Sequence, residues 1–262
     1  MVVDYFLGTM GFSYEDWKGV LYPSGVFARD YLAYYGRIFN AVEMDTTFYA
    51  IPRPAVVQGW SAVVPADFCF TVKTPQLITH ELGLVNAGQF MKEFIHVIRI
   101  LGDKLGVILI QLPPKFESNN ITVVTKFFDE LPDDISFAIE FRHRSWYTQQ
   151  TADLLASRHI SWVATEYANL PHQITPTADF VYIRWLGKHA AFPRYDQVRL
   201  DRGPRLVWWR DEIQRNINTI NRVYGFFNND YSGFAPATCN SLKAVLALPV
   251  VDFKLPVQGR LF

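Results

Sequence analysis

The sequence predicts an α/β fold, a single (β/α)8 barrel with eight parallel strands that spans residues 1–262. Short apolar runs alternate with helical patterns along the chain, which is typical of a parallel sheet with crossover helices. The chain has 262 residues, close to the length of one such barrel, about 250 residues. No Ser/Gly linker, charge block or repeat with a period of about 20–50 residues divides it. These observations favour one large domain.

Eight runs are predicted as strands because they are apolar and are bounded by glycine, proline or polar residues. The run Gly106–Leu112 is apolar almost throughout, which suits a strand buried on both faces of a parallel sheet. An open doubly wound sheet is the main alternative, but no G-x-G-x-x-G or P-loop motif supports its nucleotide-binding versions. In chain order the predicted strands are Tyr5–Met10, Ala41–Thr47, Phe68–Lys73, Gly106–Leu112, the strand that begins at Ser136, Ile160–Thr165, Asp179–Trp185 and Val223–Asn228.

The predicted helices lie between these strands and show apolar residues at helical spacing. Asp30 is expected to cap the first, and Pro54 to begin the second, since proline is tolerated in a first helical turn. The connection after the sixth strand, Tyr167 to Ala178, is short and contains two prolines, so its helix is expected to be reduced or missing. In chain order the predicted helices are Asp30–Phe39, Pro54–Val63, Ala87–Leu101, Asn120–Glu130, Thr151–Arg158, Pro204–Asn221 and Pro236–Leu248.

Composition and charge argue against several classes of protein. Lys plus Arg and Asp plus Glu both number 25, which disfavours non-specific coating of a polyanion but leaves a local basic pocket open. No apolar run reaches the ~18 residues of a membrane span, and the N-terminal stretch lacks the basic region of a signal peptide. Cys69 and Cys239 make neither a disulfide framework nor a structural zinc site. We expect a cytoplasmic protein with no membrane partner; the sequence predicts no oligomeric state.

Charged side chains gather at one end of the predicted barrel when period-two alternation is applied to every strand. In the stretch SFAIEFRHRSW, residues 136–146, Ala138, Glu140 and Arg142 share a face opposite bulky apolar residues. In most strands this face turns polar towards the C-terminal end, where barrel active sites are found. The residues predicted at this mouth are Glu43, Asp45, Lys73, Gln111, Glu140, Arg142, Arg184 and Asn228.

The predicted mouth carries three negative and three positive charges. Isolated buried charges are too costly to keep, so these must pair with each other or with a ligand. A closed salt-bridge network without a ligand is therefore one alternative. For single residues, Asp45 could cap the following turn and Gln111 could satisfy backbone groups.

Seven segments that span nearly the whole chain read GTMGFSYEDWKGVLYP, YYGRIFNAVEMDTTFYAIP, FTVKTPQLITH, ILIQLPPKF, AIEFRHRSW, FVYIRWLG and FFNNDYSGFAPATC. Together they resemble the family catalogued as domain of unknown function 72, also called YecE-like. The resemblance implies a TIM-type barrel but no activity, because the family is named for lacking one. This chain has GTMGF where the family usually has GTSGW, VEMDTTFY where it usually has VEINSTFY, and Leu186 where it often has histidine. The matching segments are Gly8–Pro23, Tyr34–Pro52, Phe70–His80, Ile108–Phe116, Ala138–Trp146, Phe180–Gly187 and Phe226–Cys239.

The charged mouth predicts an enzyme, of hydrolase or isomerase type, for a small anionic or phosphorylated substrate that is sugar-like or nucleotide-like. Glu140 or Glu43 would be the general acid or base. Lys73, Arg142 and Arg184 would hold the anion, because arginine binds anions as a planar fork. Further substrate contacts are predicted from strand ends and aromatic loops, by Gln111, Asn228, Asn229, Asp45, His143, Trp146, Tyr14 and Trp17.

No cofactor is predicted, although a divalent metal is an alternative. Glu43, Asp45, Glu140 and His143 include suitable ligand types. Three cations at the same mouth would repel the ion. A glycosidase built on the two glutamates ranks lower, since a cation is expected to neutralise each of them.

A nucleic-acid binder is the remaining alternative. Basic residues 142–144, Lys188, His189 and Arg194 could contact phosphates while aromatic residues take an unpaired base. The zero net charge allows only a short, local contact of this kind.

Overall fold

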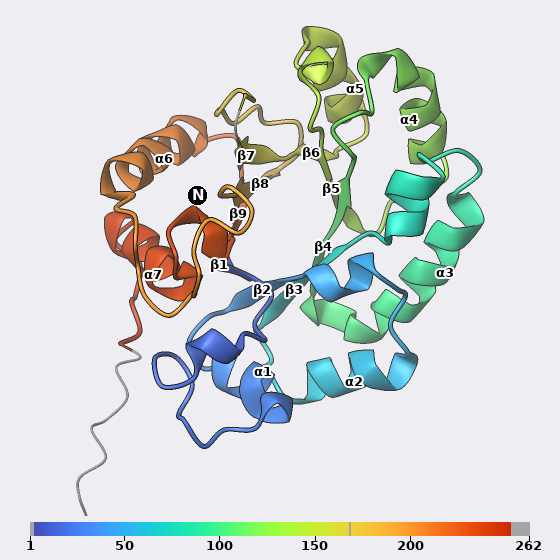
Figure 1. Cartoon of the computed structure of the whole chain (residues 1–262). Coiled ribbons are helices and arrows are strands. Elements are labelled where there is room, and N and C mark those ends of the chain that lie inside the picture. Colours follow the sequence, from blue (N-terminus) through green and yellow to red (C-terminus); the bar gives the residue numbers. More distant parts are fainter. Residues whose placement is uncertain (1–2, 168, 253–262) are drawn as a thin grey trace, which may run out of the picture.

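A computed structural model describes residues 3–167 and 169–252 of the chain. Its described strands run parallel in one sheet, in the order β6-β5-β4-β3-β2-β1-β9-β8-β7. They form a central ring with helices around it (Figure 1). The strands are β1 (Asp4–Met10), β2 (Ala41–Met44), β3 (Cys69–Lys73), β4 (Leu105–Gln111), β5 (Ser136–Glu140), β6 (Ser161–Trp162), β7 (Ala164–Glu166), β8 (Phe180–Trp185) and β9 (Arg222–Phe227).

The α/β class and the parallel barrel agree with the prediction, but the described residues form nine strands rather than eight. The predicted strand Ile160–Thr165 is interrupted at Val163, which separates β6 from β7. β6 pairs with β5, whereas β7 pairs with β8. The chain therefore changes pairing partner at Val163, and this change brings the two edges of the sheet together in a nearly closed barrel.

The helices cover the outside of the ring (Figure 1). Pro54 lies in the first turn of α2, as predicted, whereas the Asp30 side chain makes no capping hydrogen bond and α1 is shorter than predicted. Between β7 and β8 the described residues form no helix, consistent with the two prolines there. The helices are α1 (Tyr31–Tyr35), α2 (Pro54–Ala62), α3 (Gly88–Ile98), α4 (Ile121–Phe128), α5 (Gln149–Ser157), α6 (Gly203–Asn216) and α7 (Ala235–Val245).

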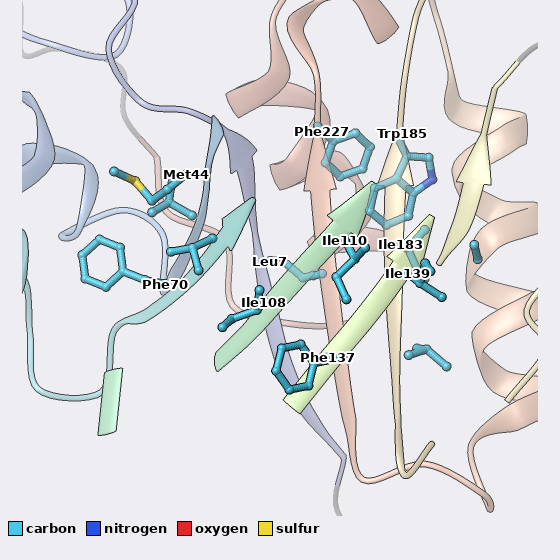
Figure 2. Close-up of a cluster of buried hydrophobic side chains, with 14 of the residues drawn as sticks. Leu7, Met44, Phe70, Ile108, Ile110, Phe137, Ile139, Ile183, Trp185 and Phe227 are labelled. Carbon is cyan, nitrogen blue, oxygen red and sulfur yellow. The ribbon is translucent and has the colours of Figure 1, made fainter. Parts of the chain in front are cut away.

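Two apolar layers lie on the two faces of the sheet. The outer layer packs between strands and helices, and Figure 2 shows part of it, including Leu7, Ile108 and Trp185. The inner layer fills the barrel. It comprises Met10, Ala41, Cys69, Val107, Leu109, Ala138, Val163, Phe180, Tyr182, Tyr224 and Phe226. In β2, β3, β4, β5, β8 and β9 these inner residues have the parity predicted for the inward face, so the predicted register is confirmed.

The inward face changes from apolar to charged along each of several strands. In β2 the inner Ala41 is followed by Glu43, and in β5 the inner Ala138 is followed by Glu140. Because all strands are parallel, these charged ends meet at one mouth. None of the described helices has both the length and the apolar character needed to cross a membrane.

Candidate functional site

Arg184 of β8 lies at the centre of the C-terminal mouth and binds two carboxylates. Its Nε and Nη2 atoms donate to Glu43 Oε2 and Oε1 of β2 at 3.0 and 2.7 Å. Its Nη1 atom donates to Glu140 Oε2 of β5. All three side chains are buried, none more than 3% exposed. Strands from opposite sides of the ring therefore meet in one charged network.

Both carboxylates have a further donor. The Tyr182 hydroxyl donates to Glu43 Oε2 at 2.6 Å and lies 2.9 Å from Thr71 Oγ1. Arg142 Nε donates to Glu140 Oε1 at 2.7 Å. Each of the four carboxylate oxygens thus accepts at least one charged or hydroxyl hydrogen bond.

The environments of the two glutamates move their pKa values apart. Burial raises the pKa of Glu43 to about 7, reinforced by the nearby Asp45 charge and opposed by Arg184. Burial also raises the pKa of Glu140, but the charges of Arg142 and Arg184 outweigh this effect and lower the pKa to about 2. The two pKa values differ because Glu140 binds two arginines, whereas Glu43 binds only Arg184, which it shares with Glu140.

Asp45 and Lys73 stand at the accessible edge of this network. Asp45 Oδ1 lies 3.7 Å from Arg184 Nη2 and has no hydrogen-bond donor among the described residues. Lys73 Nζ lies 3.9 Å above the centroid of the Phe48 ring. Burial, together with the Arg184 charge, lowers the pKa of Lys73 to about 8 against the pull of nearby carboxylates. The Asp45 Oδ1 atom and the Lys73 ammonium group therefore lie outside the hydrogen-bonded network of Arg184 and the two glutamates. The Asp45 side chain makes no capping hydrogen bond to the helical turn Asp45–Phe48.

His80 belongs to the same region and was not predicted. It lies in a π-helical turn, Leu77–Glu81, after β3, and its ring meets Phe48 edge-on at 5.0 Å. Burial and the charges of Lys73, Arg142 and Lys115 lower the pKa of His80 to about 4. The imidazole is therefore neutral at pH 7. Apolar periodicity does not reveal a π turn, so no pattern in the sequence other than the histidine itself points to this position.

A cavity of about 660 Å³ adjoins the network on the side of β7, β8 and β9. Arg142 connects the cavity to the charged network, since it lines the cavity and also binds Glu140. The cavity has more basic than acidic residues in its wall. The lining residues are Arg142, Glu166, Tyr167, His172, Leu186, Gly187, Lys188, His189, Arg202, Asn228 and Asp230.

The two predicted tryptophans are packing residues rather than platforms for a ligand. Trp146 is completely buried, with its ring stacked on Phe141 at 4.1 Å and its Nε1 atom donating to Phe116 O at 2.7 Å. Trp17 is completely buried beside Tyr14, at 4.6 Å between ring centroids. No ring face of either is left for stacking on a sugar or base.

Tyr14 is only partly buried and lies close to the charged network. Its hydroxyl donates to Met10 O at 2.7 Å, which ties its loop to the end of β1. Burial raises the pKa of Tyr14, and the charges of Asp45, Asp230 and Glu43 add to this effect.

The remaining predicted contacts mostly organise loops. Gln111 Nε2 donates to Leu112 O at 2.6 Å, so it satisfies a backbone group. Asn228 Oδ1 accepts from Asp230 N at 2.8 Å, and Asn229 Oδ1 accepts from Ala235 N at 3.1 Å. Of the three predicted contacts Gln111, Asn228 and Asn229, Asn228 alone lines the cavity.

His143 lies apart from the network. Its Nδ1 atom accepts from Ser145 N at 3.3 Å, and its Nε2 atom is 3.8 Å from Glu117 Oε1 at the surface. Within residues 3–167 and 169–252, no three His, Cys, Asp or Glu side chains are grouped so that they could hold a metal ion. The four residues that were considered as metal ligands therefore do not form one cluster.

Comparison with known proteins assigns relatives to the chain. The sequence profile described as "Protein of unknown function DUF72" matches residues 6–258. UPF0759 protein YecE of Escherichia coli K12 is 33% identical over 115 residues, a match that spans 44% of this chain and 42% of that protein. UPF0759 protein YunF of Bacillus subtilis is 28% identical over 151 residues, which span 55% of this chain and 52% of that protein. The matched part is thus about half the length of these curated relatives.

Solved structures support the fold. A DUF72 family protein from Thermotoga maritima superposes with a TM-score of 0.76 at 30% identity, covering 92% of this chain and 97% of that one. A DUF72 family protein from Enterococcus faecalis gives a TM-score of 0.77 at 22% identity, covering 97% and 99%. The second likeness concerns the fold alone.

Proposed function

The chain belongs to the DUF72 family, and because that family is described as proteins of unknown function, we propose a function from the mouth of the barrel. The mouth binds a small anionic, phosphorylated substrate, sugar-like or nucleotide-like, and Glu43 exchanges a proton with it. The reaction is of hydrolase or isomerase type. The substrate is expected to enter beside Asp45, where Arg184 Nη2 and Asp45 Oδ1 are 3.7 Å apart.

The observation that carries this proposal is the unequal bonding of two buried glutamates on one guanidinium: Glu140 also accepts from Arg142, whereas Glu43 accepts from the neutral Tyr182 hydroxyl instead. Two carboxylates on one guanidinium, with pKa values of about 7 and about 2, form an unequal pair. A group with a pKa near the working pH suits proton transfer, whereas its permanently ionised neighbour suits charge stabilisation. Enzymes that perform acid–base chemistry near neutral pH commonly separate two carboxylates in this way.

The roles within the site differ from those expected from the sequence. Glu140 stays ionised near neutral pH with both oxygens bonded, so it positions Arg184 and Arg142 rather than transferring a proton. Arg184 uses Nε, Nη1 and Nη2 on the two glutamates, so it has little capacity left for an anion. The unengaged Nη groups of Arg142 are the proposed contacts to the anionic group, and Lys73 is the proposed contact to the part of the substrate nearer Glu43.

A purely structural role is the second candidate function. Glu43 and Glu140 are both unexposed, and each oxygen already has a donor. A fully satisfied ion network can hold strands in register without any ligand. The two candidates differ in what replacement of Glu43 does to turnover.

The test begins with thermal-shift screening of sugar phosphates and nucleotides, because a ligand of the native state raises stability by mass action. Compounds that stabilise the protein are then assayed for turnover. Glu43→Gln should keep the fold and the binding but lower turnover by about 10²–10⁴-fold. Glu117→Gln, an exposed change of the same kind, should behave as wild type.

Wild-type turnover by Glu43→Gln would remove Glu43 from the chemistry. If no anionic compound stabilises the wild-type protein, the structural candidate stands and the enzymatic one fails.

A further inference from the structure

Two arginines in the cavity beside the mouth are held in the same unusual way. Arg142 Nε donates to Glu140, and its Cζ atom lies 5.0 Å from the centroid of the Tyr167 ring. Arg202 Nε donates to Tyr231 O at 2.8 Å, and its Cζ atom lies 4.4 Å from the centroid of the Tyr231 ring. In each case one hydrogen bond and one aromatic face fix the guanidinium. The Nη groups of both have no hydrogen-bond partner among the described residues.

Lys188 adds a third positive charge to this cavity. Neither it nor Arg202 has a carboxylate oxygen within 4.0 Å in the part of the chain that the structure describes. Cations that converge on a cavity without a counter-ion repel one another, and an anionic ligand relieves that repulsion.

The acidic residues of the same cavity are already engaged. Glu166 accepts from Arg205 Nε at 3.2 Å, Trp209 Nε1 at 2.6 Å and Tyr231 OH at 3.0 Å. Asp230 accepts from the Tyr195 hydroxyl at 2.5 Å. Neither carboxylate lies within 4.0 Å of a basic nitrogen of Arg142, Arg202 or Lys188.

His172 does not add a fourth charge. Its Nε2 atom lies 3.2 Å from Tyr167 O, an acceptor, so that nitrogen carries the proton. Its Nδ1 atom lies 3.2 Å from Arg205 Nη2, a donor, so that nitrogen is the acceptor. The two contacts together select the neutral tautomer.

We propose that this cavity is the phosphoryl-binding subsite of the substrate, formed by Arg142, Arg202 and Lys188. The inference rests on the proposed function, because it places the reacting end of the same molecule towards Glu43. A phosphoryl group suits the subsite better than a carboxylate, since its three oxygens match three separate cationic donors. The loops that follow the last strands of a barrel frequently hold phosphate.

The size of the cavity indicates more than an inorganic ion. Its volume of about 660 Å³ is in the range of small-molecule sites, about 300–1,000 Å³. Leu186 and Tyr167 supply an apolar part of the wall. The ligand class is therefore a phosphate monoester with an organic body of the size of a pentose or hexose.

The experiment measures binding of ribose 5-phosphate, ribose and inorganic phosphate by titration calorimetry at constant ionic strength. Wild type should bind ribose 5-phosphate, bind phosphate more weakly and not bind ribose. Arg202→Gln should weaken ribose 5-phosphate binding about 10- to 100-fold, the loss expected for hydrogen bonds to a charged group. Arg202→Lys should restore part of it, because the charge remains and the planar fork is lost.

Two controls separate this proposal from folding effects and from the proposed function. Arg210→Gln removes the same charge from the exposed side of α6, where Arg210 pairs with Asp211, and should bind as wild type. Lys188→Gln changes an exposed residue, cannot disturb the core and should also weaken binding. Glu43→Gln should retain ribose 5-phosphate binding, so that a loss of turnover can be distinguished from a loss of binding.

Equal ribose 5-phosphate affinity in wild type, Arg202→Gln and Lys188→Gln would overturn the subsite and leave the role of Glu43 intact. Failure of the wild-type protein to bind either phosphate compound at millimolar concentration would also overturn it.

Discussion

The two ends of the barrel differ in how they hold charge. The cavity at the N-terminal end is the larger, about 800 Å³ against about 660 Å³ beside the mouth. Both arginines in its wall, Arg99 and Arg222, are paired with carboxylates at the surface, whereas Asp4, Asp67 and Asp103 form no ion pair among the described residues. Arg99 Nη1 and Nη2 donate to the two oxygens of Asp134 at 2.6 and 2.8 Å, and both side chains are about half exposed.

The mouth has the opposite character. Glu43, Glu140 and Arg184 are buried, and their partners are fixed by strand register rather than by flexible surface contacts. Beside them, Arg202 and Lys188 have no carboxylate oxygen within 4.0 Å among the described residues. Cavity volume alone would favour the N-terminal end, whereas buried charges with displaced pKa values, which are common at functional sites, lie at the mouth. In barrels of this class the N-terminal face is associated with stability and the C-terminal face with chemistry.

The sharpest test of this contrast is Arg184→Met. It removes the shared cation and leaves two carboxylates in a low-dielectric interior. We expect a loss of about 3–5 kcal/mol in the free energy of unfolding, the range measured when one partner of a buried ion pair is removed. Urea unfolding followed by circular dichroism checks it. A loss below about 1 kcal/mol, the scale of exposed ion pairs, would mean that the network is hydrated and that the two ends do not differ.

Much of this network could be predicted from the sequence, and the reason is geometric. Strand side chains alternate with a period of two, so the parity of Glu43, Glu140 and Arg184 follows once each strand is recognised. Because the strands are parallel, the inward-facing charged side chains at their C-terminal ends then meet at one end of the barrel. No pairwise contact needed to be known.

The features of the fold and the site that the sequence did not predict depend on packing between residues that are far apart in the chain. The break at Val163 arises because the chain must pair first with β5 and then with β8, which the sequence run itself does not encode. Trp146 follows a charged strand end and reads as an exposed loop residue, yet Phe116 and Phe141 enclose it. The expectation that Arg184 holds an anion stays a prediction; that three of its nitrogens bind Glu43 and Glu140 becomes visible only when both glutamates are placed.

The pH dependence of stability offers a second way to sharpen the contrast. The folded-state pKa of Glu43, about 7, is above its ordinary value of 4.5, so the folded protein binds the extra proton between these values. Stability from Glu43 therefore falls as pH rises from about 4.5 to 7, by up to about 1.4 kcal/mol per pH unit. Glu43→Gln should remove this fall, as measured by urea unfolding at pH 5 and pH 7.5.

Glu140 is expected to change the unfolding free energy with pH in the opposite direction, measured in the same experiment. Its folded-state pKa, about 2, is below its ordinary value of 4.5, so its contribution is present above pH 4.5 and is lost as pH falls towards 2. Glu140→Gln should remove that acid-side loss and leave the fall between pH 4.5 and 7. If both variants change the same pH window, the two glutamates are not separated in pKa, and the basis for assigning proton transfer to Glu43 is lost.

The smallest effect is expected at the N-terminal end, for Arg99→Gln. The pair with Asp134 is exposed, and water and salt replace it readily. The unfolding free energy at pH 7 should stay within the error of extrapolation, about 10–15%. The hydrogen bond from Arg99 lowers the pKa of Asp134, so any contribution is present above the ordinary value of 3.8 and disappears as pH falls below it. Ribose 5-phosphate binding should be unchanged in this variant. A large loss of stability, or a loss of ligand binding, would show that the charges of the N-terminal end are as tightly integrated as those of the mouth.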